Sequence, residues 1–457
     1  MGESQTRSFV LRGDVCYNRS LTEFDARRDA YVVCVDGVSQ GVFDELPDRY
    51  QGLPVVDCAG RLVVPGLVDL HVHAPQYTFR GIAMDLELLD WLNTYTFPEE
   101  SKYADLAYAD EAYGYFAQDL RASATTRAAI FASLHVPATA LLMDKLEATG
   151  LKTYVGKVNM DRNSPDSLTD GSAQASLAAT CAWLDQVDGA YRNTRPIITP
   201  RFSPSCTDAL MEGLGALAGE RGLPVQSHLS ENLTEIAWVG ELCPWAACYG
   251  ETYDRWGLLG GADKGARKGG ADKGGATERG TGPGVTERGA SKAIMAHCNY
   301  SSPEEVELLR ARGTYVAHCP QSNANVASGI APVRRYLDLG MDVGLGTDVA
   351  GGASLSMFRG VTDAVMASKL RWRCVDQSLA PLTIQEAFYL ATLGGGSFFG
   401  RVGSLAAGYD FDALVLDDSG IRSPRQLGVE QRLERFCYLH GEGGRIEHKY
   451  VAGNKVF

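Results

Sequence analysis

Two histidines separated by a single residue, His71 and His73, end a short apolar run that begins at Leu67. Such a run is typical of a buried strand. Alternate side chains of a strand share one face, so we expect the two imidazoles to lie about 7 Å apart on the same side. Neutral imidazole nitrogen is a common zinc ligand. Alone the pair is a weak signal, because histidines also line polar strand ends that bind no metal.

Three later strand-like runs each end in another potential ligand: His228, His297 and Asp348. An acidic residue, Glu231, follows the first of them by three positions. Enzymes built as parallel barrels place their active sites at the carboxyl ends of the strands. Four imidazoles and one carboxylate at the same rim therefore predict a metal site.

The elements that must position these side chains alternate between strands and helices. Besides 67–73, we expect strands at 126–131, 152–158, 197–201, 224–228, 293–297, 314–318 and 342–346. Helical patterns separate them, as at 105–122, 138–150 and 303–312. About eight such units close into a (β/α)8 barrel, so the predicted fold class is α/β, with a TIM-like barrel.

The two ends of the chain have a different pattern. Short strand-like runs and turns fill residues 1–64, and strands return within 401–457, so we expect these ends to form one small β-sandwich domain beside a barrel at 65–400. Residues 260–292 repeat GGADKG and TERG and contain almost no bulky apolar side chains. We interpret them as a flexible low-complexity insertion, because they cannot bury enough surface to offset the entropy of ordering.

Composition excludes several classes of protein. The 457 residues are 45% hydrophobic and 22% charged, with a net charge of −13 and no long basic run, which argues against binding nucleic acid or an anionic membrane. No apolar run approaches the ~20 residues that span a bilayer. Eleven cysteines without zinc-ribbon spacing argue against a disulfide framework and favour a reducing, cytoplasmic setting.

The same histidines and aspartate, in this order on a barrel, resemble the amidohydrolase superfamily in its single-metal aminohydrolase branch. Similarity runs through most of residues 60–415, and the strings TPRFSPSC and GLGTDVAGG are more specific than the ligands themselves. They point to the members of the branch that act on guanine. The stretches that carry the resemblance are 65–76, 85–98, 196–206, 226–232, 295–297, 317–323 and 344–352.

This resemblance implies one Zn²⁺ per chain and hydrolytic deamination of guanine to xanthine and ammonia, a step of purine catabolism or salvage. It assigns the metal to His71, His73, His228, His297 and Asp348. Zinc can bring the pKa of a bound water to about 7, and the departing ammonia needs a proton. Glu231 suits that proton transfer, being near the metal without being a ligand, and Asp348 could share it.

For the base, the resemblance points to Gln76, Arg201 and Phe202, with Trp91 as a candidate for the pocket wall. Arg201 has only donors and suits a carbonyl oxygen, while Phe202 offers a ring face for stacking. A homodimer is implied by the resemblance alone.

Two alternatives stay open. The chain could be a related aminohydrolase acting on another heterocycle, such as S-adenosylhomocysteine, a triazine or a pterin. The pair Arg201–Phe202 favours guanine over these. Some members of the superfamily are non-catalytic assembly proteins that have lost metal ligands, whereas this chain keeps all five and the acid.

Overall fold

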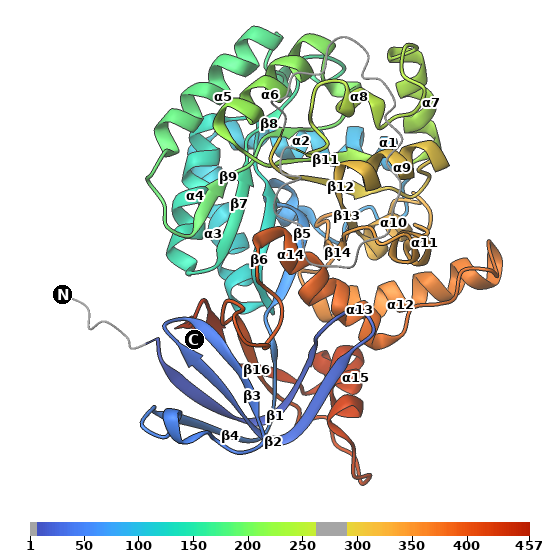
Figure 1. Ribbon diagram of the computed structural model, residues 1–457. Helices are drawn as coiled ribbons and strands as arrows, with labels where there is room; N and C mark the ends of the chain where they lie inside the picture. The colour runs from blue at the N-terminus through green and yellow to red at the C-terminus, as the bar shows by residue number, and fades with distance from the viewer. Residues whose placement is uncertain (1–6, 262–289) are drawn as a thin grey trace, which may run out of the picture.

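The protein, described here by a computed structural model over residues 7–261 and 290–457, consists of a ring of strands surrounded by helices and a sheet beneath it (Figure 1). The predicted insertion at 260–292 falls almost entirely outside the described residues. Among the helices of the described ranges, none has both the length and the apolar character needed to cross a membrane.

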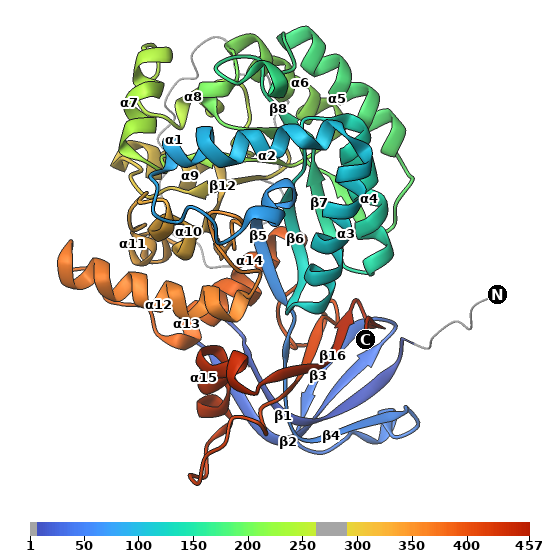
Figure 2. The same ribbon diagram turned by 180° about the vertical axis from the view of Figure 1, so that it is seen from behind.

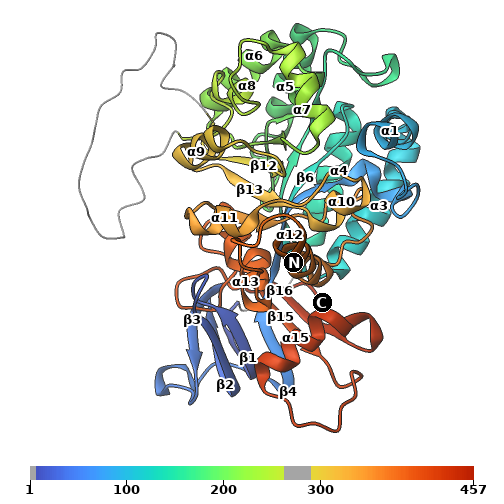
Figure 3. The same cartoon turned by 90° about the vertical axis from the view of Figure 1, so that its right-hand side faces the viewer.

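The sheet is built from both ends of the chain (Figure 3). Strand β4 pairs in parallel with β1 and antiparallel with β15, so it joins the first strands to the last. The expected association of the two ends is confirmed, and hydrogen bonds unite the strands of the expected sandwich in one continuous sheet. Its order is β17 (Asn454–Lys455), β16 (Arg445–Val451), β15 (Ala413–Asp417), β4 (Val55–Pro65), β1 (Phe9–Asn18), β2 (Phe24–Val35) and β3 (Val38–Phe43).

An aromatic cluster holds these two ends together. The ring of Phe9 lies 5.2 Å from Phe411 and 4.9 Å from Tyr450, and all three side chains are buried. Aromatic pairs at such separations stabilise packing beyond the area they bury. The sheet therefore has its own apolar core, separate from that of the ring.

Two parallel four-stranded sheets make up most of the ring. The first contains β5 (Leu67–His73), β6 (Thr125–Phe131), β7 (Lys152–Gly156) and β9 (Thr194–Pro196). The second contains β11 (Val225–Leu229), β12 (Ala293–His297), β13 (Tyr315–His318) and β14 (Val343–Leu345). The short pair β8 (Val158–Asn159) and β10 (Thr199–Pro200) lies between β7 and β11 in the chain.

Backbone hydrogen bonds close the ring at both seams. Gln226 donates to the carbonyl of Ile198 at 3.0 Å, and Asp348 donates to the carbonyl of His71 at 2.8 Å. At the second seam a Cβ on Gly346 would lie 2.7 Å from Cβ of His71, so only glycine allows the strands to approach this closely. The predicted barrel is confirmed.

One predicted strand is interrupted. We expected a continuous strand at 197–201, whereas β9 ends at Pro196 and β10 contains only Thr199 and Pro200. Proline has no N–H to donate to a sheet, so a strand flanked and ended by proline stays short.

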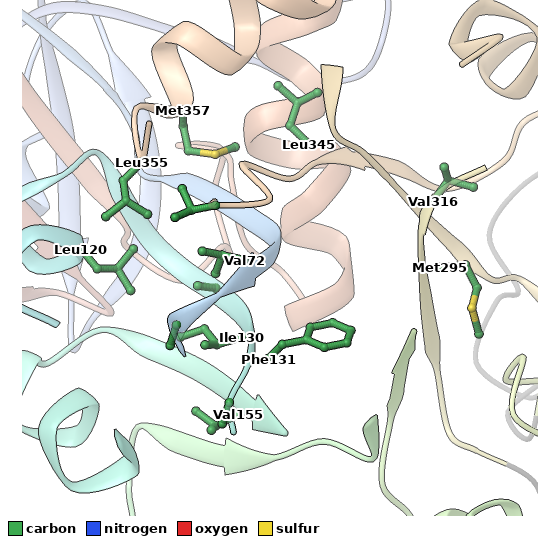
Figure 4. Packing of buried hydrophobic residues seen from close by; sticks show 14 of the residues in the cluster. Val72, Leu120, Ile130, Phe131, Val155, Met295, Val316, Leu345, Leu355 and Met357 are labelled. Carbon is green, nitrogen blue, oxygen red and sulfur yellow. The ribbon is translucent and has the colours of Figure 1, made fainter. Parts of the chain in front are cut away.

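Helices pack around the ring, and their buried faces share one large core with the strands. Figure 4 shows part of that core, with Val72 and Ile130 from strands beside Leu120 and Met357 from helical segments. The helices are α1 (Leu88–Trp91), α2 (Phe97–Ser101), α3 (Leu106–Ala122), α4 (Val136–Thr149), α5 (Ala173–Val187), α6 (Asp208–Arg221), α7 (Leu233–Leu242), α8 (Glu251–Asp254), α9 (Pro303–Arg312), α10 (Pro320–Asn325), α11 (Val333–Asp338), α12 (Met357–Cys374), α13 (Ile384–Tyr389), α14 (Gly395–Phe399) and α15 (Val429–Leu439).

Candidate active site

The side chains of the five predicted metal ligands meet at the strand ends. His71 and His73 end β5, His228 lies in β11, His297 ends β12, and Asp348 follows β14. Nε2 of His73 is 3.2 Å from Nε2 of His71 and 3.2 Å from Nε2 of His228. Oδ1 of Asp348 is 3.1 Å from Nε2 of His71. In each of the groups His71, His228, His297 and His71, His73, Asp348, the possible ligand atoms lie within 4.8 Å of one another.

A backbone carbonyl determines the tautomer of His228. Nδ1 of this imidazole lies 2.7 Å from the carbonyl oxygen of Arg201, which can only accept. The proton therefore resides on Nδ1, and the lone pair of Nε2 faces the cluster. Such a partner on the outer nitrogen is typical of a histidine that binds a metal through the inner one.

A chain of hydrogen-bonded amides determines the tautomer of His297. Nδ2 of Asn299 donates to the carbonyl of Glu231 at 3.0 Å, which leaves Oδ1 of Asn299 to accept from Nδ2 of Asn323 at 2.8 Å. Oδ1 of Asn323 then accepts from Nδ1 of His297 at 2.9 Å. Because the chain starts at a carbonyl, every orientation along it follows, and Nε2 of His297 presents a lone pair to the cluster.

The electrostatics of the cluster favour a cation at its centre. Burial lowers the pKa of both His73 and His228 well below the ordinary value, so these imidazoles are neutral. At His297 burial also opposes charge, but Glu231 and Asp348 outweigh it and raise the pKa. For Asp348, burial is outweighed by His71 and the other imidazoles, so its pKa is lowered and the carboxylate is ionised. Neutral imidazoles with one carboxylate are donors that zinc takes.

Two of the five residues have an uncommon backbone conformation. His297 has φ of 72° and Asp348 has φ of 48°, both in the left-handed region that residues other than glycine rarely adopt. Strained conformations of this kind concentrate at functional sites, where the surrounding structure maintains them. Here they occur where the chain leaves strands β12 and β14, and both residues are members of the cluster.

Glu231 lies at the edge of this cluster. Its Oε2 is 3.4 Å from Nε2 of His297, and its Oε1 accepts a hydrogen bond from Ser328 Oγ at 2.8 Å. Burial raises the pKa of this carboxyl group to about 7. A group with that pKa exchanges protons readily near neutrality, which suits an acid–base role.

A cavity opens beside the cluster, with α1 and α2 lying across the ring there (Figure 2). All four residues predicted to contact a base line it. Phe202 is 7% exposed, and the Nε1 atom of Trp91 has no hydrogen-bond partner within the described residues, so it is available as a donor. The full lining is His73, Gln76, Leu88, Trp91, Leu92, Arg201, Phe202, His228, Glu231, Glu235, His297, Ser322, Val326 and Asp348.

A buried carboxylate that the sequence analysis did not identify links two of the residues predicted to contact a base. Glu100, in α2, pairs through Oε2 with Nη1 of Arg201 and accepts from Nε2 of Gln76 through Oε1 at 2.8 Å. Oε1 of Gln76 accepts from the backbone N–H of Ala350 at 3.2 Å. One N–H of the Gln76 amide and further N–H groups of Arg201 remain for a ligand.

Other lining residues were also missed by the sequence analysis. Oγ of Ser322 donates to Oδ2 of Asp348, and the buried Glu235 accepts from the backbone N–H of Glu231 at 3.1 Å. Cys319 does not line the cavity, but its Sγ lies within 4.8 Å of ligand atoms of His297 and Asp348. Ser322 and Cys319 belong to the string AHCPQSN, which was noted for its resemblance but not assigned a role.

Comparisons with known proteins agree with this geometry. Residues 62–443 match the model of the amidohydrolase family. The guanine deaminase of Dictyostelium discoideum is 35% identical over 410 residues, covering 88% of this chain and 84% of that relative. The human guanine deaminase is 36% identical over 406 residues, covering 86% and 82%. The crystal structure of guanine deaminase from C. acetobutylicum with bound guanine superposes with a TM-score of 0.89 at 42% identity, covering 98% of this chain and all of that one.

Proposed function

The chain belongs to the amidohydrolase family and, within it, to the guanine deaminases, and we propose that it hydrolyses guanine to xanthine and ammonia. Water adds to the ring carbon that carries the amino group, and that C–N bond then breaks. The observation that carries the proposal is one shared cavity: Arg201 and Phe202 line it together with Glu231 and the histidine cluster.

We propose that His71, His73, His228, His297 and Asp348 hold one zinc ion. The mutual distances and the inward lone pairs of His228 and His297 support this assignment. When bound, zinc would acidify a water molecule so that hydroxide is available near neutral pH.

Glu231 is the proposed proton carrier. Its Oε2 atom faces the metal cluster next to His297, while its other oxygen is held by Ser328. From this position the carboxylate can accept a proton from the attacking water and return it to the amino group, which must leave as ammonia. Asp348, whose pKa is lowered, remains ionised and is less suited to carry the proton, although it lies beside the same site.

Base recognition is assigned to the other side of the cavity. Arg201 donates to the carbonyl oxygen of guanine, Phe202 stacks on the ring, and Gln76 and Trp91 supply further N–H donors. Adenine has an amino group where guanine has its carbonyl, so adenine would set a donor against the donors of Arg201.

Three wider properties are part of the same proposal. The eleven cysteines all lie in the described part of the chain and are free thiols, which supports a reducing, cytoplasmic setting for a step of purine catabolism. Helix α12 extends away from the body (Figures 1 and 2), and the exposed apolar side chains of Met366, Leu370, Trp372 and Val375 support pairing with a second copy as a homodimer. We assign no nucleic-acid or membrane partner.

The test is a substrate panel with purified protein. Turnover would be followed spectrophotometrically for guanine, adenine, a pterin and a triazine, with metal content measured on the same sample. We expect rapid conversion of guanine alone and about one zinc per chain. Preferential turnover of a pterin or triazine would transfer the assignment to the related aminohydrolases that act on those rings.

A further inference from the structure

The carboxylate of Glu100 is buried next to the proposed base-binding groups. Glu100 is 2% exposed and Arg201 is 3% exposed, so both charges of this pair are removed from solvent. Nη1 of Arg201 and Nε2 of Gln76 donate to different oxygens of the same carboxylate. Glu100 thus orients both Arg201 and Gln76, although Glu100 itself does not line the cavity.

Among the residues that the structure describes, Glu100 supplies the carboxylate that is paired with Arg201, and no other ion pair of either side chain is found there. The guanidinium lies 5.1 Å from the ring centre of Phe97. Burial lowers the pKa of His73 most, and the charges of His71, His228 and, last, Arg201 lower it further. Tyr103 and Tyr113 are the titratable groups that face Glu100, and burial raises the pKa of both, so they stay neutral.

We propose that Glu100 is a positioning residue that also determines the charge preference of the base pocket. By cancelling the charge of Arg201, it makes the pocket select a neutral purine over a purine anion. This inference rests on the proposed function, because Arg201 must face the base. Its consequence concerns the product: xanthine is a stronger acid than guanine and becomes an anion under mildly alkaline conditions.

The physical reason is the strength of charge-assisted hydrogen bonds. A buried guanidinium without a counter-ion would hold an anionic oxygen far more tightly than a neutral carbonyl, since both partners are charged and removed from water. With Glu100 in place, the guanidinium of Arg201 already has a counter-ion. Guanine and neutral xanthine then bind through ordinary donor–acceptor pairs, and ionised xanthine is released.

The decisive variant is Glu100→Gln, which removes the charge but keeps the shape and one acceptor oxygen. Inhibition of guanine turnover by added xanthine would be measured below and above the pH at which xanthine ionises. In the unaltered enzyme we expect inhibition to weaken as xanthine becomes anionic. In the variant we expect it to strengthen, so that the two inhibition constants diverge by about 10-fold or more.

The neighbouring residue provides a matched control. Glu99 lies on the same helix, but its carboxylate accepts from Oγ1 of Thr78 and from Nζ of Lys102, both at 2.6 Å. Glu99→Gln should therefore keep the pH dependence of the unaltered enzyme. Glu100→Asp, which keeps the charge on a shorter side chain, should lower kcat/KM for guanine while inhibition by xanthine still weakens with rising pH.

The opposite variant keeps the inference open to refutation if Glu100→Gln does not fold. Arg201→Gln leaves the Glu100 carboxylate without its cation, so ionised xanthine should bind still more weakly than to the unaltered enzyme, as measured by calorimetry. An unchanged pH dependence of xanthine binding in Glu100→Gln or in Arg201→Gln would overturn the inference. Failure of the proposed function is distinguishable, because the unaltered enzyme would then not convert guanine at all.

Discussion

The two sides of the cavity are held in place by different kinds of partner. On the metal side, the imidazoles stand on strands and are oriented from behind by uncharged groups, as His228 is by the carbonyl of Arg201 and His297 by the amide of Asn323. On the side proposed to bind the base, called the base side below, Gln76 and Arg201 are oriented by the carboxylate of Glu100, which belongs to the short helix α2. The uncharged partners turn the Nε2 lone pairs of His228 and His297 toward a cation. The charged partner instead offsets a cation that is already present.

Removing a ligand from the metal side should have the largest effect. His228→Ala and His297→Ala each break the donor set, so we expect loss of bound metal and of nearly all deamination. Metal analysis and the guanine assay would measure both. His135→Gln, at a histidine outside the three possible metal-binding groups of the described residues, is the control and should keep its metal. Full metal occupancy in either alanine variant would contradict the ligand assignment.

The second largest loss of activity is expected at Glu231, which lines the cavity beside His297. Glu231→Gln should keep the fold and the metal, because the amide can still accept the hydrogen bond of Ser328, yet lose about 10²–10⁴-fold in kcat. Metal content and stability of the same sample serve as the control. Turnover close to that of the unaltered enzyme would move the proton transfer elsewhere, with Asp348 the first residue to examine.

On the base side, the loss should be smaller and should depend on the substrate. Arg201→Met removes the proposed charged donor to the guanine carbonyl, and we expect kcat/KM for guanine to fall by about 10²-fold while adenine remains a very poor substrate. Arg195→Met, at an exposed arginine of β9, is the matched control and should leave both values unchanged. Equal rates for the two bases in the unaltered enzyme would refute the assignment of Arg201.

The smallest effect concerns Lys449, a buried lysine outside the cavity for which the described part of the chain offers no ion pair with a carboxylate. Nζ of Lys449 donates to the carbonyls of Arg121 and Ser123, both at 2.9 Å, where α3 ends. Burial lowers its pKa to about 7, while the unfolded chain holds this proton up to about pH 10.4. The unfolded state therefore binds more protons between these values, so the contribution of Lys449 to stability increases as pH rises through this range.

Replacing this cation tests the contrast with Arg201, whose charge is paired. In Lys449→Met the increase in stability from about pH 7 to about pH 10 should be smaller than in the unaltered protein, by at most about 1.4 kcal/mol per pH unit. Thermal midpoints of both proteins across that range would measure the difference, with Lys455→Met, at an exposed lysine of β17, as the control. Identical pH profiles for the unaltered protein and Lys449→Met would mean that Lys449 stays protonated in the fold.

The meeting of the five residues on the proposed metal side could be predicted from the sequence, because they lie at or just after the ends of strands. A strand alternates its side chains and ends at the active rim of a barrel, so a histidine or aspartate at such an end, like His228 or Asp348, has a predictable place. The base side offered no such rule. Glu100 belongs to the sequence FPEES, where its neighbour Glu99 has the same chemistry and a different partner, and only the packing of α2 distinguishes the two.

The fold shows the same difference between regular and irregular segments. The barrel strands could be recognised from their apolar runs, except where Pro196 and Pro200 divide one of them. Helix α15 was missed within a tail expected to contain strands, although the buried side chains of Val429, Leu433 and Phe436 have helical spacing. The helical spacing of these residues is visible in the sequence. The strand-like runs before and after them led us to expect strands throughout the tail.

The position of β4 in the sheet has a consequence for synthesis of the protein. One edge of β4 pairs with β1, which precedes it in the chain, whereas the other pairs with β15, which is synthesised only after the whole barrel. Until then an apolar strand presents unpaired N–H and C=O groups to the cell, a surface prone to pairing with other chains. The segment that carries His71 and His73 to the proposed metal site is thus attached to the part of the molecule that is completed last.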